Sequence, residues 1–228
     1  MSARVAIVVF PGSNCEHDVA LALDGLGADP NFVWHTDVSL RNADAVVLPG
    51  GFAHGDYLRP GALARFSPIM KAIGDFAASG GPVLGICNGF QILCEAGLLP
   101  GALQKNQRLK FICAPSRVRV DSNHSVITNG IDEGVTLALP INHFDGNYIC
   151  DARTAADLRE TNSIILRYTA NPNGSIDDIA GISNLKGNVA GLMPHPERAC
   201  DPLSGSVDGE LLLRALVRAA LTEDGIAR

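Results

Sequence analysis

The sequence predicts a single α/β domain built on an open, mostly parallel, doubly wound sheet, with helices on both faces and some antiparallel additions. First, 228 residues with 46% hydrophobic and 18% charged side chains suffice for one large core and are too apolar for a disordered chain. Second, short apolar runs end at Pro-Gly or Gly-Gly turns, as strands in parallel sheets often do. Third, helical periodicity follows these runs. With no repeat or linker, residues 1–228 are predicted to form one domain.

The first half of the chain alternates between strand and helix. Strands are predicted over residues 5–10, 31–35, 45–48 and 83–86. The first is followed by a helix that Ser13 or Asn14 can cap and that ends near Gly25, with Val19, Leu23 and Leu26 on one face. Two further helices are predicted over 69–79 and 88–95. Helices that connect successive strands in this way are what parallel pairing requires.

The second half is richer in strands. Strand-like patterns cover residues 109–120, 141–149, 163–168, 179–183 and 188–193, with a turn-rich segment at 171–174. These strands are expected to be antiparallel additions or an edge of the same sheet. A final helix over 208–222 would place one apolar face on the core, made of Leu211, Leu212, Ala215, Leu216 and Ala219.

The charge balance excludes several classes of function. The 18 basic and 24 acidic side chains give a net charge of −6 without any Lys/Arg-rich stripe, so binding to nucleic acid or to an anionic membrane is not expected. No apolar stretch approaches the roughly 20 residues of a membrane span, and residues 1–10 lack a signal-peptide pattern, which predicts a cytoplasmic protein. The six cysteines include no C-x-x-C pair, so neither a disulfide scaffold nor a metal site is expected.

The strongest chemical signal is the segment Gly85-Ile86-Cys87-Asn88-Gly89, between a predicted strand and a predicted helix. A nucleophile at such a sharp turn needs residues without a Cβ two positions before and after it. The turn lifts the Cys87 thiol to a helix N-terminus, where the dipole favours thiolate, and the Asn88 backbone N–H can serve as an oxyanion donor. The plain alternative is a buried cysteine in a glycine-rich turn.

A thiol nucleophile needs a base, and the best candidate lies in Met193-Pro194-His195-Pro196-Glu197. If the prolines hold this segment extended, His195 and Glu197 lie on one face, and the carboxylate can fix the imidazole tautomer. Taken alone, a histidine between two prolines is more often an ordinary turn residue.

Other segments carry weaker signals. Residues 49–52 end a strand with exposed backbone N–H groups, and Gly51 and Phe52 can complete an oxyanion hole. No phosphate-binding loop occurs, so no ATP site is expected. Cys15 also lies at a predicted helix start but lacks the second glycine, which makes it a weaker candidate nucleophile. His54 and His143 are expected in loops that border a pocket or face a partner.

The chain resembles the class I, triad-type glutamine amidotransferases, which combine a G-x-C-x-G-x-Q elbow with a downstream H-P-E. Here the elbow is residues 85–91 and the downstream motif is residues 195–197. Within that family it is most similar to the glutaminase subunits of phosphoribosylformylglycinamidine synthases, enzymes of de novo purine synthesis. The similarity rests on residues 10–15, 49–59, 171–175 and 193–198, which span most of the chain. Residues 142–146 depart from the His-Gly-Glu-Gly of that group, so no role is assigned to them.

The resemblance implies that Cys87 attacks the glutamine amide, that His195 protonates the departing ammonia and activates water, and that Glu197 orients His195. It also implies that Gln91 and the backbone around Gly51 and Phe52 hold the glutamine. The chain itself would need no cofactor. ATP and magnesium would bind to a large synthetase subunit, to which a small bridging subunit often attaches the glutaminase.

Three other interpretations remain open. A cysteine hydrolase or redox sensor related to the DJ-1 and PfpI proteins would have a similar fold, but those proteins usually have histidine where this chain has Asn88. A non-catalytic binding module is disfavoured because all three triad residue types are present. An amidotransferase serving a different synthetase shares the triad, and only the peripheral segments argue against it.

Overall fold

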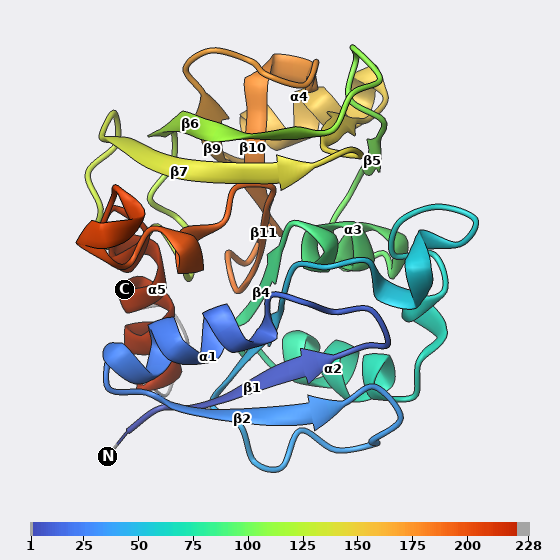
Figure 1. The fold of residues 1–228 in the computed structure, drawn as a ribbon, viewed down its shortest axis with the longest axis vertical. Helices are drawn as coiled ribbons and strands as arrows, with labels where there is room; N and C mark the ends of the chain where they lie inside the picture. The colour runs from blue at the N-terminus through green and yellow to red at the C-terminus, as the bar shows by residue number, and fades with distance from the viewer. Residues whose placement is uncertain (1, 223–228) are drawn as a thin grey trace.

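A computed structural model describes residues 2–222 as a nine-stranded mixed sheet with helices packed on it (Figure 1). The strand order is β2-β1-β3-β4-β11-β10-β9-β6-β7, and a two-stranded sheet of β5 and β8 lies apart from it. β1, β2, β3, β4 and β11 pair in parallel, whereas every pair from β11 through β10, β9 and β6 to β7 is antiparallel. The predicted α/β fold class is confirmed.

The parallel half follows the predicted alternation. Its elements are β1 (Arg4–Val9), α1 (Glu16–Gly25), β2 (Asp29–Trp34), β3 (Ala45–Leu48), α2 (Ile69–Ala78), β4 (Val83–Ile86), α3 (Asn88–Glu95) and β11 (Val189–Leu192). The β1-α1-β2 and β3-α2-β4 crossovers run in opposite directions along the sheet. Because such crossovers are right-handed, α1 and α2 cover opposite faces. α5 (Gly209–Ala220) contacts α1 and β3.

The antiparallel half forms the upper part of Figure 1. It contains β6 (Ile112–Val120), β7 (Thr136–His143), β9 (Ile164–Tyr168) and β10 (Ile179–Ser183), with α4 (Ala152–Glu160) between β8 and β9. The small sheet pairs β5 (Ala102–Gln104) with β8 (Asn147–Ile149). The described residues also include the short 3-10 turns η1 (Ala53–Asp56), η2 (Ala64–Phe66), η3 (Ile176–Asp178), η4 (Pro196–Arg198) and η5 (Pro202–Ser204).

Two local predictions at helices are wrong. The N-cap of α1 is Cys15, and neither Ser13 nor Asn14 caps it, because the Ser13 hydroxyl instead accepts from the Phe10 N–H at 3.0 Å. On α5, Leu213 rather than Leu211 completes the buried face, and the Leu211 side chain is 43% exposed.

Strand boundaries in the second half also differ from the prediction. The strand expected over 141–149 is two strands, β7 and β8, separated by a turn at residues 144–146. β5 and α4 were not predicted. The C-terminal helix ends at Ala220, and the last six residues of the chain lie outside the described part.

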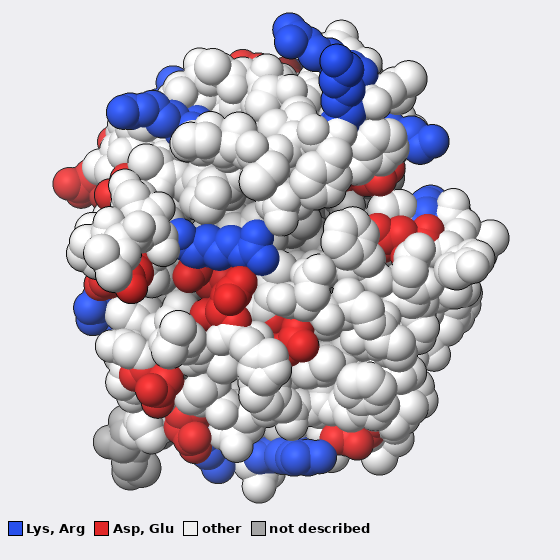
Figure 2. All heavy atoms as spheres, viewed as in Figure 1, with Lys and Arg blue, Asp and Glu red and all other residues white. Residues whose placement is uncertain are grey.

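The face seen in Figure 2 carries basic and acidic side chains interspersed, with no large region of one sign. Within residues 2–222, no helix is both long enough and apolar enough to cross a membrane.

Candidate active site

The parallel strands bring four separate loops to one edge of the sheet. The carboxyl ends of parallel strands lie on the same side, so the loops after β1, β3, β4 and β11 meet there. A pocket at this edge is lined by Cys15, Gly51, Asp56, Cys87, Gln91, His143, Asp145 and His195, together with Asn14, Phe52, Asn142 and Phe144. Residues far apart in the sequence thereby form one site.

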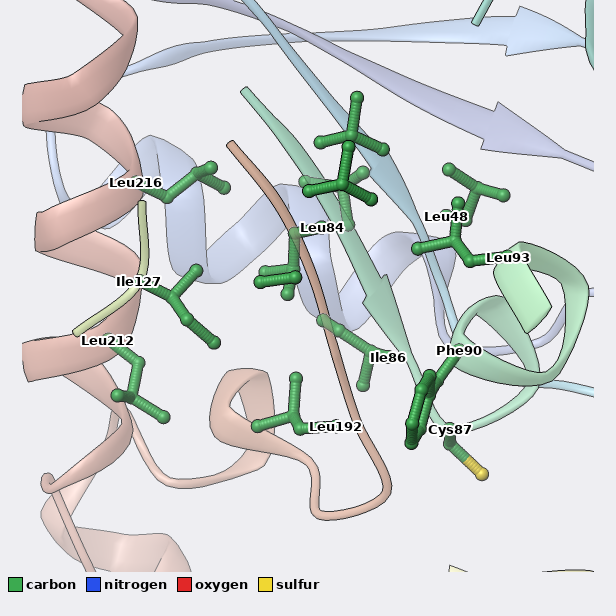
Figure 3. Packing of buried hydrophobic residues seen from close by; sticks show 14 of the residues in the cluster. Leu48, Leu84, Ile86, Cys87, Phe90, Leu93, Ile127, Leu192, Leu212 and Leu216 are labelled. Carbon is green, nitrogen blue, oxygen red and sulfur yellow. The ribbon is translucent and has the colours of Figure 1, made fainter. Parts of the chain in front are cut away.

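Cys87 lies at the turn from β4 into α3 in a strained conformation, with φ 50° and ψ −104°. Such strain in a residue other than glycine requires support from its surroundings, and it recurs at nucleophile elbows. A Cβ on Gly89 would lie 1.9 Å from the Leu48 carbonyl oxygen, and one on Gly85 would lie 2.7 Å from the Gly89 backbone. Figure 3 shows the Cys87 sulfur pointing away from the labelled apolar side chains. The tight turn therefore presents the thiol to the pocket.

His195 and Glu197 form a buried pair. The Nδ1 atom of His195 lies 2.6 Å from Glu197 Oε1, and the side chains are 1% and 0% exposed. The segment is not extended as expected, because Pro196 begins the short turn η4, which still places Glu197 beside His195. Within the described residues, no hydrogen-bond partner reaches His195 Nε2. With Nδ1 bound to Glu197, Nε2 is the ring nitrogen left for chemistry.

The electrostatics favour the charged form of His195. Burial lowers its pKa, but the Glu197 carboxylate and the Cys87 thiol act in the opposite direction, and the net result is a pKa raised well above the ordinary value. A positive imidazolium beside Cys87 is the partner that a thiolate needs. The geometry is therefore that of a nucleophile, a base and an orienting carboxylate.

The remaining predicted binding residues form the wall beside Cys87. Asn88 Nδ2 donates to Gln91 Oε1 at 2.8 Å, and Gln91 Nε2 donates to the Asp145 carbonyl at 2.7 Å. The Phe52 N–H already donates to the Gly12 carbonyl at 2.8 Å. Of Gly51 and Phe52, only Gly51 therefore has a backbone N–H left to offer a ligand.

Asp56 and Asp145, which the sequence patterns did not single out, both line the pocket. Burial and the nearby Asp145 raise the pKa of Asp56 to about 6, and burial also raises the pKa of Asp145. Asn88 Nδ2 donates to Asp56 Oδ1 at 3.3 Å. Two acidic side chains in one pocket predict a cationic group in the ligand.

Both His54 and His143 were expected in loops, but His143 is the last residue of strand β7. It lines the pocket, whereas His54, in the turn η1, does not. His143 Nδ1 lies 3.0 Å from Asn106 Oδ1, and burial lowers its pKa to about 4. The His54 ring instead lies among Phe10 and His35, with ring centroids 6.4 and 5.3 Å away. Cys15 is buried and also lines the pocket, next to His195.

Comparison with known proteins gives consistent matches over most of the chain. The model of a CobB/CobQ-like glutamine amidotransferase domain matches residues 2–211. A phosphoribosylformylglycinamidine synthase subunit PurQ from Rubrobacter xylanophilus is 54% identical over 217 residues, which are 95% of this chain and 99% of that one. The PurQ subunit of Koribacter versatilis is 49% identical over 226 residues, covering 95% of this chain and 98% of its own.

Solved structures agree with these relatives. A chain in the structure of PurLQS from Thermotoga maritima has a TM-score of 0.88 and 42% identity, covering 96% of this chain and 99% of its own. A glutamine amidotransferase from the same organism has a TM-score of 0.56 at 18% identity, covering 97% of this chain and 93% of its own, and so shares the fold.

Proposed function

This chain belongs to the CobB/CobQ-like glutamine amidotransferase family, and from that premise we propose that it is the glutaminase subunit of a phosphoribosylformylglycinamidine synthase. It hydrolyses L-glutamine to glutamate and ammonia for a synthetase subunit, which converts formylglycinamide ribonucleotide to formylglycinamidine ribonucleotide in purine (IMP) biosynthesis. The observation that carries the chemistry is the buried His195–Glu197 pair in the pocket of the Cys87 elbow. The family match does not favour a DJ-1-like hydrolase or redox sensor.

In the proposed reaction, the Cys87 sulfur attacks the side-chain amide carbon of glutamine. His195, charged by the thiol proton, donates that proton to the departing nitrogen, and ammonia leaves a glutamyl thioester behind. The neutral imidazole then takes a proton from water, which attacks the thioester and releases glutamate. Glu197 holds the Nδ1 proton throughout, so Nε2 is the atom that exchanges protons. The Gly51 and Asn88 N–H groups are the proposed donors to the oxyanion.

The same pocket suggests how glutamine is held. The paired carboxylates of Asp56 and Asp145 suit the α-ammonium group, and Gln91 fixes the wall between them through Asn88 and the Asp145 carbonyl. The pocket volume is only about 30 Å³, whereas ligand pockets are typically ~300 Å³ or more. We propose that docking on the synthetase widens the pocket to admit glutamine.

We propose that ATP and magnesium bind to the partner synthetase and that this chain needs no cofactor of its own. Ammonia released into water would be mostly protonated and no longer nucleophilic, so it has to pass directly to the large subunit. A small bridging subunit would complete the assembly. Six free cysteines and the metabolic role favour a cytoplasmic location.

The test is glutamate release from glutamine by the purified chain, alone and with the synthetase subunits, ATP and formylglycinamide ribonucleotide. We expect slow release by the chain alone and a sharp rise in the full mixture, because docking opens the pocket. If a demonstrably assembled complex releases no glutamate above a Cys87→Ser blank, the proposed function is wrong.

Asp56 should make glutamine binding depend on pH. If the ionised carboxylate binds the α-ammonium group, binding improves as pH rises through about 6, the pKa of Asp56. A single group with that pKa predicts that KM for glutamine falls about tenfold between pH 5 and pH 7. Steady-state KM values of the assembled complex measure this. Asp56→Asn should raise KM and remove the pH dependence; an unchanged slope in this variant would show that another group is responsible.

A further inference from the structure

Cys15 begins helix α1, yet its side chain belongs to the catalytic pocket. It is 2% exposed and lines the pocket together with Cys87 and His195. Its Sγ atom, a ring nitrogen of His195 and a carboxylate oxygen of Glu197 all lie within 4.8 Å of one another. The proposed reaction assigns no role to this second thiol.

Two hydrogen bonds fix the Cys15 side chain in place. Arg198 Nη2 donates to Cys15 Sγ at 3.1 Å, and the thiol donates to Asn14 Oδ1 at 3.3 Å. The Arg198 guanidinium is itself held on α1, because its Nε donates to Asp18 Oδ2 at 3.1 Å. With its proton directed at Asn14, this thiol is placed neither to attack glutamine nor to act as a base.

The sulfur instead lies close to the His195 ring. A Cβ on Gly50 would lie 2.8 Å from His195 Cε1 and 3.0 Å from Cys15 Sγ, so the ring edge and the sulfur both pack against this one backbone position. Within residues 2–222, the ring makes a single side-chain hydrogen bond, from Nδ1 to Glu197. A single hydrogen bond at Nδ1 does not by itself fix the orientation of the ring. Catalysis requires a fixed orientation, so other contacts must restrict the ring.

We propose that Cys15 is a positioning residue: its anchored sulfur and the Gly50 backbone together restrain one edge of the His195 imidazole, so that Nε2 stays directed at Cys87. This inference rests on the proposed glutaminase function. Arg198 has the supporting role of holding the sulfur in place. Cys15 thereby connects the start of α1 with the triad. It acts by packing against His195 and takes no part in the chemistry on the substrate.

Replacement of Cys15 by alanine tests the proposal in the assembled complex. Removal of the sulfur should lower kcat for glutamine hydrolysis on the order of tenfold to a hundredfold, as misplacement of a catalytic group does, with KM changed less than twofold. Cys15→Ser can keep both hydrogen bonds and should recover most of the loss. If Cys15→Ala does not fold, Arg198→Gln frees the sulfur while retaining the thiol, and a fall in kcat is again expected.

The pH profile separates positioning from general packing. His195 faces Glu197, Cys87 and Cys15, with His143 and Arg198 close by, and the nearby Cys15 sulfur contributes to the raised pKa of His195. Loss of Cys15 should therefore move the alkaline limb of kcat/KM to lower pH, because the imidazolium loses its proton earlier. A variant that only disturbs packing would have a lower unfolding temperature, and the alkaline limb of its kcat/KM profile would not move.

Cys113→Ala is the matched control, since this thiol is exposed on β6 and should leave both kcat and the profile unchanged. Wild-type kcat with an unshifted limb in Cys15→Ala would overturn the positioning role. Failure of the glutaminase proposal would look different, because the wild-type complex itself would then release no glutamate.

Discussion

Cys87→Ser should abolish glutamine-dependent synthesis by the assembled complex while ammonia-dependent synthesis survives. The hydroxyl is a far weaker nucleophile than a thiol paired with an imidazolium, so glutamate release should fall at least about 10³-fold. Serine has the same Cβ as cysteine, so the elbow at φ 50° is not strained further. Synthesis is followed with glutamine or with ammonium salt as the nitrogen source.

The two nitrogen sources are what make this experiment decisive. Ammonia enters the synthetase without the glutaminase chemistry, so the large subunit should keep its own rate. Size-exclusion chromatography must show that the variant complex is assembled. Loss of both activities in an intact complex would contradict the proposed division of labour, and retention of both would remove Cys87 from the chemistry.

The elbow could be predicted from sequence because its determinants are local. Gly85 and Gly89 are required by close backbone contacts around Cys87, and the three residues lie within one short segment. His195 and Glu197 were expected to lie side by side, and they do, but the reason given for it was only partly correct. Their separation of two residues suffices, but a turn starting at Pro196, not an extended chain, brings them together.

The acidic wall of the pocket could not be predicted in this way. Asp56 lies in the loop after β3 and Asp145 in the turn after β7, and only the folded sheet brings these loops together. No spacing rule relates them in sequence. The same holds for Cys15 and Arg198, which are 183 residues apart in the sequence and meet at the start of α1.

Helix α4 was missed although a local signal existed. Its sequence is mostly polar and buries only Ala155 and Leu158, so the hydrophobic pattern is weak. The Asp151 side chain, however, accepts from the Thr154 N–H at 2.7 Å, which is the N-cap arrangement that an Asp before a polar helix predicts. Capping residues therefore carry more information than apolar periodicity in a helix of this kind.

Gly89→Ala should damage the fold and the site together. The added Cβ would lie 1.9 Å from the Leu48 carbonyl oxygen and 2.6 Å from its carbon, which belong to the backbone of the interior strand β3 and cannot rotate away. Either α3 or β3 must shift. Overpacking of a rigid core costs about 3 kcal/mol, which should lower the unfolding temperature by roughly 10 °C in a domain of this size.

Gly74→Ala is the matched control, because it is also a glycine inside a helix but a Cβ there meets nothing within 4 Å. Alanine should stabilise α2 by about 0.5–1 kcal/mol through its higher helix propensity. Thermal unfolding and glutamate release are measured for both variants. Since the shift of α3 also moves Cys87, Gly89→Ala should lose glutaminase activity even well below its unfolding temperature. An active, stable Gly89→Ala protein would show that the elbow does not need the close approach seen here.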